Sequence, residues 1–251
     1  MNLAVCLKRV PDTTTKVKIG SDGKSIDPQG VEWAISPYDE LAIELALRLK
    51  EKAGGETVGI TVDRDGNDVA LRKALAIGLD KGILIKGGAN FDGWATAQVL
   101  AAVLKGRPFD VLLFGKQAID DDGFQVPTMV AQILGLPRVN VCTAFEIEGT
   151  KAKCRRQIEG GEEQIEVSLP CVISIQKGVN GIHDKRFPSM KGIMAAKSKP
   201  VETVAAAAVD SSMEIVKLEL PPERPPGRIV GKGVEAVPEL VRLLREEAKV
   251  L

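Results

Sequence analysis

The chain has 251 residues, with 34 basic residues, 34 acidic residues and one histidine. This length can bury a large core as one domain, or as one domain with an appendage. The balanced charge gives no overall attraction to nucleic acid or to an anionic membrane surface, and no apolar run approaches the roughly 20 residues of a membrane span.

His183 limits the chemistry that side chains can perform. It is the only histidine, so no His-based metal site and no Ser-His-Asp triad can form without it. Its glycine-flanked, polar surroundings predict an exposed loop. We therefore expect no metal site and no acid–base enzyme.

The four cysteines are scattered, without a CxxC pair. This usage predicts small buried thiols in a reducing compartment. The N-terminus shows no signal-peptide pattern, which predicts a cytoplasmic protein for a prokaryotic source. In a eukaryote, the mitochondrial matrix would require a processed precursor.

The first half of the chain alternates strands and helices. Buried strands are predicted at residues 3–10, 57–62, 82–85 and 111–114, and a hairpin excursion is predicted at residues 16–26. Helices are predicted from Ser36 to about Gly54, at residues 68–77 and at residues 96–104. Ser36 is expected to cap the first helix, with Pro37 at its first position and Asp39 closing a capping box. This alternation predicts a Rossmann-like α/β fold, with a mostly parallel sheet flanked by helices.

The pattern changes after Pro137. Residues 143–147, 151–158 and 164–168 are separated by turn residues, which predicts an antiparallel β insertion across 143–168. Residues 171–175 predict a last strand that returns to the main sheet, and residues 190–197 predict a short helix.

Clustered prolines follow the short helix. They predict an extended arm from Pro200 to Gly233, without a core of its own, and Pro238 starts a terminal helix with an apolar face. We therefore expect an α/β nucleotide-binding domain at residues 1–200 and an arm with a helix at residues 201–251.

The main candidate site is the loop after the strand at residues 111–114. In open α/β sheets, ligands bind beyond the carboxyl ends of strands, where helix-start amides can hold an anion. Gly115 and Gly123 are expected to let the backbone approach such a ligand. Asp120, Asp121 and Asp122 repel phosphate through their side chains, so backbone amides would have to hold it.

Two interpretations of this loop stay open from the residues alone. One is a nucleotide site. The other is an Asp-rich helix start, whose carboxylates match the helix dipole. The loop is not a Walker loop, because Lys116 lies on the wrong side of the glycine and the acids.

Five ordered blocks carry a family resemblance. They are GKQAIDDD with Gln125 (residues 115–125), VCLKRVPD (5–12), ISPYDELAIELALRLKE (35–51), KALAIGLDKG (73–82) and RFPSMKGIMAAKSKP (186–200). In these blocks the chain resembles the β subunit of electron transfer flavoproteins (ETF), along almost its whole length. The resemblance implies an adenine nucleotide α-hydrolase-like fold.

The resemblance also implies function. ETF is a heterodimer in which the α subunit holds most of the FAD site and the β subunit holds a structural AMP. It carries electrons from acyl-CoA or other flavin dehydrogenases to ETF:quinone oxidoreductase and is not itself an enzyme. Carried over by position, the AMP contacts are Cys6, Ser36, Pro37, Tyr38, Asp39, Val62, Gly115, Lys116, Gln117, Ala118, Ile119, Asp120, Asp121, Asp122, Gly123, Phe124, Gln125 and Val126.

The chain departs from the family pattern in three places. Ser36 stands where relatives often have Asn, Gly123-Phe124 replaces a more polar pair, and residues 180–186 are longer than usual. A bifurcating branch of the family binds a second FAD in the β subunit and uses NADH. Residues 10–13 (VPDT) resemble that branch, whereas Asp121 favours the AMP branch.

Met190 is the expected partner-docking residue, within a partner-recognition segment at residues 180–197. An apolar residue here enters a pocket of the dehydrogenase in the family, whereas Ile193 and Met194 are expected to pack inside the protein. The competing hypothesis is a stand-alone nucleotide-binding module of the universal-stress kind, which would need neither this segment nor the arm.

Overall fold

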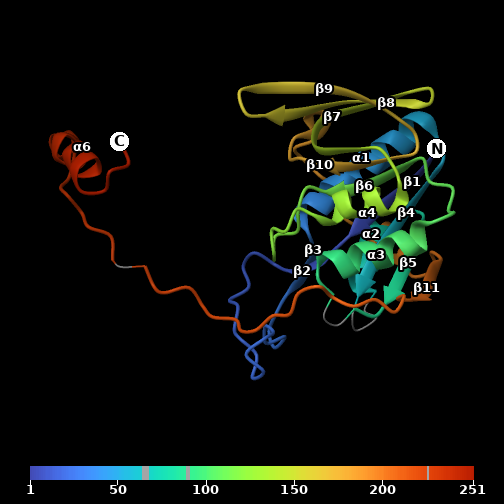
Figure 1. The fold of residues 1–251 in the computed structure, drawn as a ribbon, viewed down its shortest axis with the longest axis horizontal. Helices are drawn as coiled ribbons and strands as arrows, with labels where there is room; N and C mark the ends of the chain where they lie inside the picture. The colour runs from blue at the N-terminus through green and yellow to red at the C-terminus, as the bar shows by residue number, and fades with distance from the viewer. Residues whose placement is uncertain (64–67, 89–90, 225) are drawn as a thin grey trace.

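The computed structural model describes residues 1–251 except 64–67, 89–90 and 225. Within the described residues, nine strands form one mixed sheet in the order β11-β5-β4-β1-β6-β10-β7-β8-β9 (Figure 1). Neighbouring strands from β11 to β7 are parallel, whereas β8 is antiparallel to both β7 and β9. The predicted α/β fold with a mostly parallel sheet is confirmed.

The strands of this sheet are β1 (Asn2–Leu7), β4 (Glu56–Asp63), β5 (Lys81–Lys86), β6 (Val111–Gly115), β7 (Arg138–Glu148), β8 (Lys151–Ile158), β9 (Gly161–Ser168), β10 (Cys171–Ile175) and β11 (Val201–Ala205). A separate antiparallel pair consists of β2 (Arg9–Pro11) and β3 (Trp33–Ile35). The predicted first strand is therefore interrupted at Lys8, between β1 and β2.

The helices are α1 (Pro37–Ala53), α2 (Val69–Ile77), α3 (Gly93–Leu104), α4 (Val126–Leu134), α5 (Met190–Ala196) and α6 (Val237–Glu246), with single 3-10 turns η1 (Val179–Gly181) and η2 (Val234–Ala236). In the described part of the chain, no helix is both long enough and apolar enough to cross a membrane.

Two apolar cores lie on opposite faces of the sheet. Successive side chains of a strand point to opposite faces. On β1, Leu3 and Val5 pack with the apolar side chains of α1 and α2, whereas Ala4 and Cys6 pack with those of α3 and α4. Because both faces are covered, the central strands read as continuous apolar runs, as buried parallel strands do.

Strand β7 joins the parallel part of the sheet to the antiparallel part. It starts at Arg138, earlier than predicted, and its first residues pair with β10. Its register shifts opposite Ile173–Ile175, and Val141 there has a φ of 59°, which a β-branched residue rarely adopts. The Val141 N–H donates to Ser174 Oγ at 3.0 Å. The predicted antiparallel insertion is therefore continuous with the main sheet.

The arm starts later than its prolines suggested. We expected an extended segment from Pro200, but Val201–Ala205 forms β11, which pairs with β5 along its length. Ala206 and Val209 still pack against the core. The rest of the arm runs away from the α/β body and ends in α6, which Figure 1 shows apart from the sheet.

Further hydrogen bonds attach the first part of the arm to the body, and three of them are backbone N–H bonds. Asp92, the N-cap residue of α3, accepts hydrogen bonds from Ser212 N–H at 2.7 Å and from Met213 N–H at 3.0 Å. The third is a hydrogen bond from Leu218 N–H to the carbonyl of Gly23, at 2.8 Å, in the predicted hairpin excursion. The free part of the arm therefore begins after Leu218.

Candidate functional site

The carboxyl ends of three neighbouring strands form the edge at which the site was predicted. β1 lies between β4 and β6, with Leu7 opposite Thr61, and Thr61 Oγ donates to the Leu7 carbonyl at 3.0 Å. The last residues of these strands therefore lie together. Cys6, Val62 and Gly115 come to one edge, as predicted.

Asp39 joins this edge to α1. The predicted capping box is wrong, because Ser36 makes no side-chain cap and Asp39 faces the strand ends instead. One carboxylate oxygen accepts from Lys8 N–H at 2.8 Å and the other accepts from Gly115 N–H at 3.0 Å. Asp39 therefore accepts hydrogen bonds from one backbone N–H after β1 and from one at the end of β6. These are tertiary contacts between distant segments, and not a cap of its own helix.

Gly115 has a packing role that the sequence analysis did not predict. A Cβ atom at this position would lie 2.4 Å from Asp39 Oδ1 and 2.7 Å from Tyr38 Cβ. Gly115 is therefore required for the close approach of α1 to β6. A Cβ at Gly123 would lie 3.4 Å from its nearest neighbour, an ordinary contact, so this glycine stands in open surroundings.

The loop between β6 and α4 has a fixed backbone. Lys116 N–H donates to the Ile175 carbonyl at 3.0 Å, and Asp122 N–H donates to the Ala118 carbonyl at 2.9 Å. Asp122 and Phe124 have φ values of 47° and 55°, in the left-handed region that non-glycine residues seldom adopt. Such conformations cluster at ligand-binding sites, where the surrounding structure holds them.

Other predicted residues border this loop. Ser36 is fully buried, and its Oγ lies 3.4 Å from the Gln117 carbonyl, to which it donates. Asp120, Asp121, Asp122, Gly123 and Phe124 are exposed. The loop thus contacts the buried Ser36 hydroxyl on its inner side, and its residues 120–124 are exposed on the outer side.

Lys8 is a residue that the sequence interpretation missed. Its Nζ atom lies 2.9 Å from Asp120 and 2.8 Å from Asp121. Burial by itself lowers the pKa of Lys8, but the two carboxylates outweigh it and the pKa is raised. A signal was available in the sequence. Lys8 directly follows the buried strand β1, and the adjacent strand β6 is followed by the three acids Asp120, Asp121 and Asp122.

Burial changes the protonation of two predicted site residues. It raises the pKa of Asp39 to about 7, against the opposing effect of the two N–H groups that it accepts from. Burial, followed by the charge of Asp39, raises the pKa of the Cys6 thiol, which is therefore neutral. All four cysteines are buried and free, as predicted.

Met190 lies on α5, which packs against α2. The two helices approach closely at Gly192, where a Cβ atom would lie 2.2 Å from the Ala76 carbonyl oxygen. Met190 is 78% exposed. Ile193 and Met194, which we expected to pack, are exposed as well, so that prediction was wrong and the apolar surface is larger than expected.

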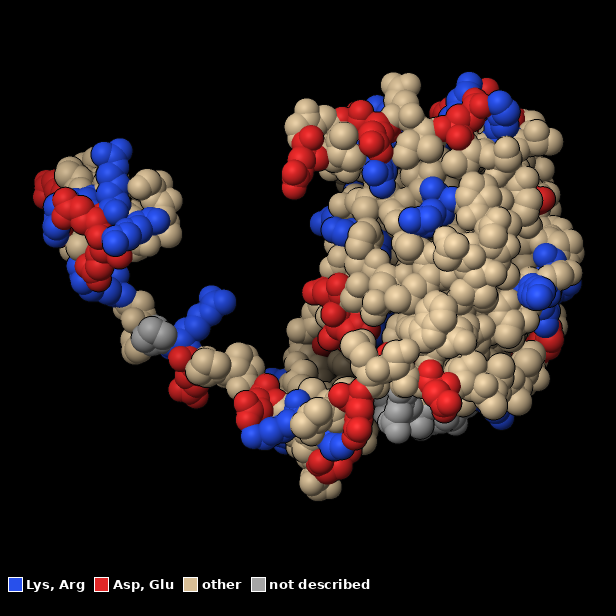
Figure 2. Space-filling view, viewed as in Figure 1, with Lys and Arg blue, Asp and Glu red and all other residues tan. Residues whose placement is uncertain are grey.

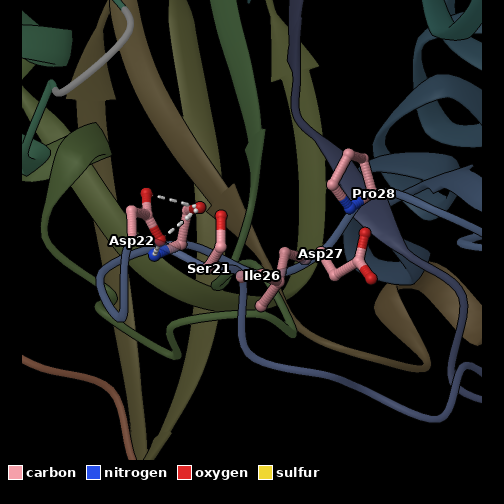
Figure 3. Close-up of a pocket in the computed structure, with 7 residues that line it drawn as sticks. Ser21, Asp22, Ile26, Asp27 and Pro28 are labelled. Carbon is pink, nitrogen blue, oxygen red and sulfur yellow. Dashed lines mark hydrogen bonds between the residues drawn. The ribbon is translucent and has the colours of Figure 1, made fainter.

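A cavity of about 320 Å³ lies elsewhere, in the hairpin excursion. It is lined by Gly20, Ser21, Asp22, Ser25, Ile26, Asp27 and Pro28. Asp22, labelled in Figure 3, accepts a hydrogen bond from the Ser25 hydroxyl at 2.8 Å. None of these residues belongs to the predicted site.

In the described residues, no group of three or more His, Cys, Asp or Glu side chains could hold a metal ion.

The fold defines an α/β protein with a mostly parallel sheet, a class in which ligands commonly bind beyond the carboxyl ends of the strands. Comparison with known proteins names the family. The model for the electron transfer flavoprotein domain matches residues 24–209. The chain is 47% identical to the electron transfer flavoprotein subunit beta of Syntrophomonas wolfei, over 96% of this chain and 92% of the relative. It is 39% identical to the subunit beta of Bacillus subtilis over the full length of both chains, and 33% identical to that of Mus musculus over 98% and 97%. The chain therefore belongs to the electron transfer flavoprotein β-subunit family.

Proposed function

We propose that this chain forms a heterodimer with an ETF α subunit, with AMP on the loop after β6 and with FAD held mainly by the α subunit at the interface. The dimer accepts electrons from acyl-CoA or other flavin dehydrogenases and delivers them to ETF:quinone oxidoreductase. The observation that carries this proposal is the loop at the carboxyl edge, tied to α1 through Asp39, in a chain of this family.

The donors around the loop fit AMP. Backbone N–H groups of an exposed, left-handed loop suit a phosphate, because they offer hydrogen bonds without a mobile side chain. The open surroundings of Gly123 leave room for a phosphate group beside the backbone. Ser36 and Cys6 lie beneath, where the adenosine part is expected.

This chain does no bond chemistry in the proposal. FAD supplies the electron transfer when it is bound, and the protein supplies position and electrostatics. On the face seen in Figure 2, acidic and basic side chains are interspersed and form no single charged patch, which agrees with a protein partner rather than nucleic acid.

The arm is proposed to hold the α subunit. No residue of α6 is buried, and the helix carries a strongly apolar face with Val237 and Leu240 exposed. An exposed apolar helix at the end of an extended segment gains stability when it docks on another surface. The stand-alone nucleotide module has no use for this segment.

The exposed apolar surface on α5 is proposed to meet the dehydrogenase. Phe187, Met190 and Met194 are all more than half exposed. Methionine is flexible and polarizable, which suits a surface that has to fit several partners.

The test is mass spectrometry of the nucleotides released when the purified αβ complex is denatured. We expect one FAD and one AMP per complex. Two FAD and no AMP would support the bifurcating alternative, which the VPDT sequence at residues 10–13 favours. A colourless protein that releases only AMP would support the stand-alone nucleotide module.

A further inference from the structure

A connected set of polar contacts holds the start and the acidic middle of the loop after β6. Asp39 joins the N–H groups of Lys8 and Gly115, at 2.8 Å and 3.0 Å. The side chain of Lys8 then extends to Asp120 and Asp121, at 2.9 Å and 2.8 Å. We call these five residues the Lys8 network. It links the residue after β1, the first turn of α1, the end of β6 and the acidic part of the loop.

The network reduces a charge problem in the proposed site, because the positive charge of Lys8 offsets part of the negative charge of the acids. A phosphate group beside three consecutive carboxylates is repelled unless those charges are neutralised. Lys8 pairs with two of the three, and Gln117 Nε2 donates to the third, Asp122. Asp121 also accepts from Gly123 N–H at 3.0 Å. The acids therefore point toward Lys8 and toward the loop itself, and they act as internal supports of the loop.

The contacts lower the proton affinity of one of these acids. Burial by itself raises the pKa of Asp121, but the hydrogen bonds from Lys8 and Gly123 outweigh it and the pKa is lowered. Asp121 is therefore ionised at neutral pH, and its charge needs the ammonium group of Lys8.

We propose that Lys8 is a positioning residue of the nucleotide site, which holds Asp120 and Asp121 so that the loop accepts the phosphate of a nucleotide. This inference rests on the proposed AMP site. The Lys8 ammonium group contacts Asp120 and Asp121, so we expect it to act through these two acids. Its effect is therefore confined to the phosphate-bearing part of the ligand.

The exposure of Lys8 makes it suitable for a test. Its side chain is 44% exposed, and exposed ion pairs contribute little to folding stability. Lys8→Met keeps most of the length of the side chain, lacking only the terminal atom, and removes the charge. Lys50→Met is the matched control, because Lys50 pairs with Asp80 at 2.6 Å beside Thr57, at the amino end of β4.

The experiment measures equilibrium binding of AMP and of adenosine to the nucleotide-depleted αβ complex. We expect Lys8→Met to weaken AMP binding about tenfold or more, and to leave adenosine binding unchanged, because adenosine has no phosphate. Lys8→Arg should bind AMP nearly as well as wild type. Adding Asp121→Asn to Lys8→Met should restore part of the AMP affinity, since it removes one uncompensated charge. Lys50→Met should change neither ligand.

Equal losses of AMP and adenosine in Lys8→Met would overturn the proposal, as would wild-type AMP binding. A wild-type complex that binds no AMP would instead contradict the proposed AMP site. Amide hydrogen exchange of residues 116–122 then tests the network without any ligand. Faster exchange in Lys8→Met, but not in Lys50→Met, supports it, and unchanged exchange overturns it.

Discussion

Among single residues, the buried carboxyl group of Asp39 gives the clearest expectation for pH. Its pKa is raised by burial from 3.8 to about 7, next to Cys6, Lys8 and Asp120. Between these two values the folded protein binds more protons than the unfolded chain, so the stabilisation from Asp39 is greatest below pH 4 and is lost as the pH rises to about 7. The full shift corresponds to roughly 4 kcal/mol.

Asp39→Asn should remove this pH dependence. The free energy of unfolding, measured by urea titration from pH 5 to pH 8, should fall less steeply with pH in the variant than in wild type. The amide group of Asn cannot accept from both N–H groups, so some stability is also lost at every pH. Parallel curves for the two proteins would show that Asp39 does not titrate in this range.

Met190 has a separate expected effect. Because its side chain is 78% exposed, Met190→Ala should leave the melting temperature and the flavin content unchanged. Loss of an interface anchor typically costs ~2 kcal/mol or more, so electron transfer from the dehydrogenase should slow by about an order of magnitude or more. Reduction by small chemical donors should stay the same. Lys191→Ala, also at an exposed position, is the control. A variant that loses flavin while keeping its rate per flavin would contradict the docking role of Met190.

Among elements, Asp92 joins α3 to the arm. One of its oxygens accepts from Ala95 N–H at 2.8 Å as an N-cap, and the other accepts from Ser212 N–H and Met213 N–H. Asp92→Ser keeps a capping oxygen but not the second contact, whereas Asp92→Ala removes both. Hydrogen exchange at residues 212–213 should therefore accelerate in both variants. The melting temperature should fall further in Asp92→Ala, by the ~1 kcal/mol that a cap contributes.

Equal melting temperatures for the two Asp92 variants would mean that the cap contributes nothing measurable. Protection of residues 212–213 that survives in both variants would mean that other contacts hold the arm. Lys24, whose ammonium group lies 2.7 Å from Glu214, is then the contact to remove next.

The elements also show why part of the structure could be predicted from the sequence. Helix α2 lies within the predicted range, because Asp68, Gly78 and the apolar periodicity between them are local signals. Strand β11 was missed because five residues with little periodicity become a strand only by pairing with β5, far away in the sequence. The parallel start of β7 was missed for the same reason.

The site shows the same division between local and distant signals. The strand ends and the loop could be placed because each is marked by its own residues. The role of Asp39 could not, because its carboxylate can cap its own helix or accept from Lys8 and Gly115, and only tertiary placement decides between them. Lys8 was overlooked because its partners are distant in the sequence.

In the whole molecule, the arm divides into two parts with different expected roles. Residues 201–218 belong to the body through β11, through the Asp92 contacts and through Leu218. Beyond them lie η2 and α6, in which no residue is buried. A truncation that tests partner binding should therefore remove residues 219–251 only.

Deleting residues 219–251 should leave a body that melts at the wild-type temperature, because none of its core residues is lost. The same protein should fail to form a stable, FAD-containing complex with the α subunit, measured by size-exclusion chromatography with absorbance at flavin wavelengths. Deleting residues 201–251 is the contrasting control. It also removes β11 and exposes the edge of β5, so its melting temperature should fall and its tendency to aggregate should rise. If the shorter deletion still yields a flavin-containing heterodimer, the α subunit is held by the α/β body and α6 has another role.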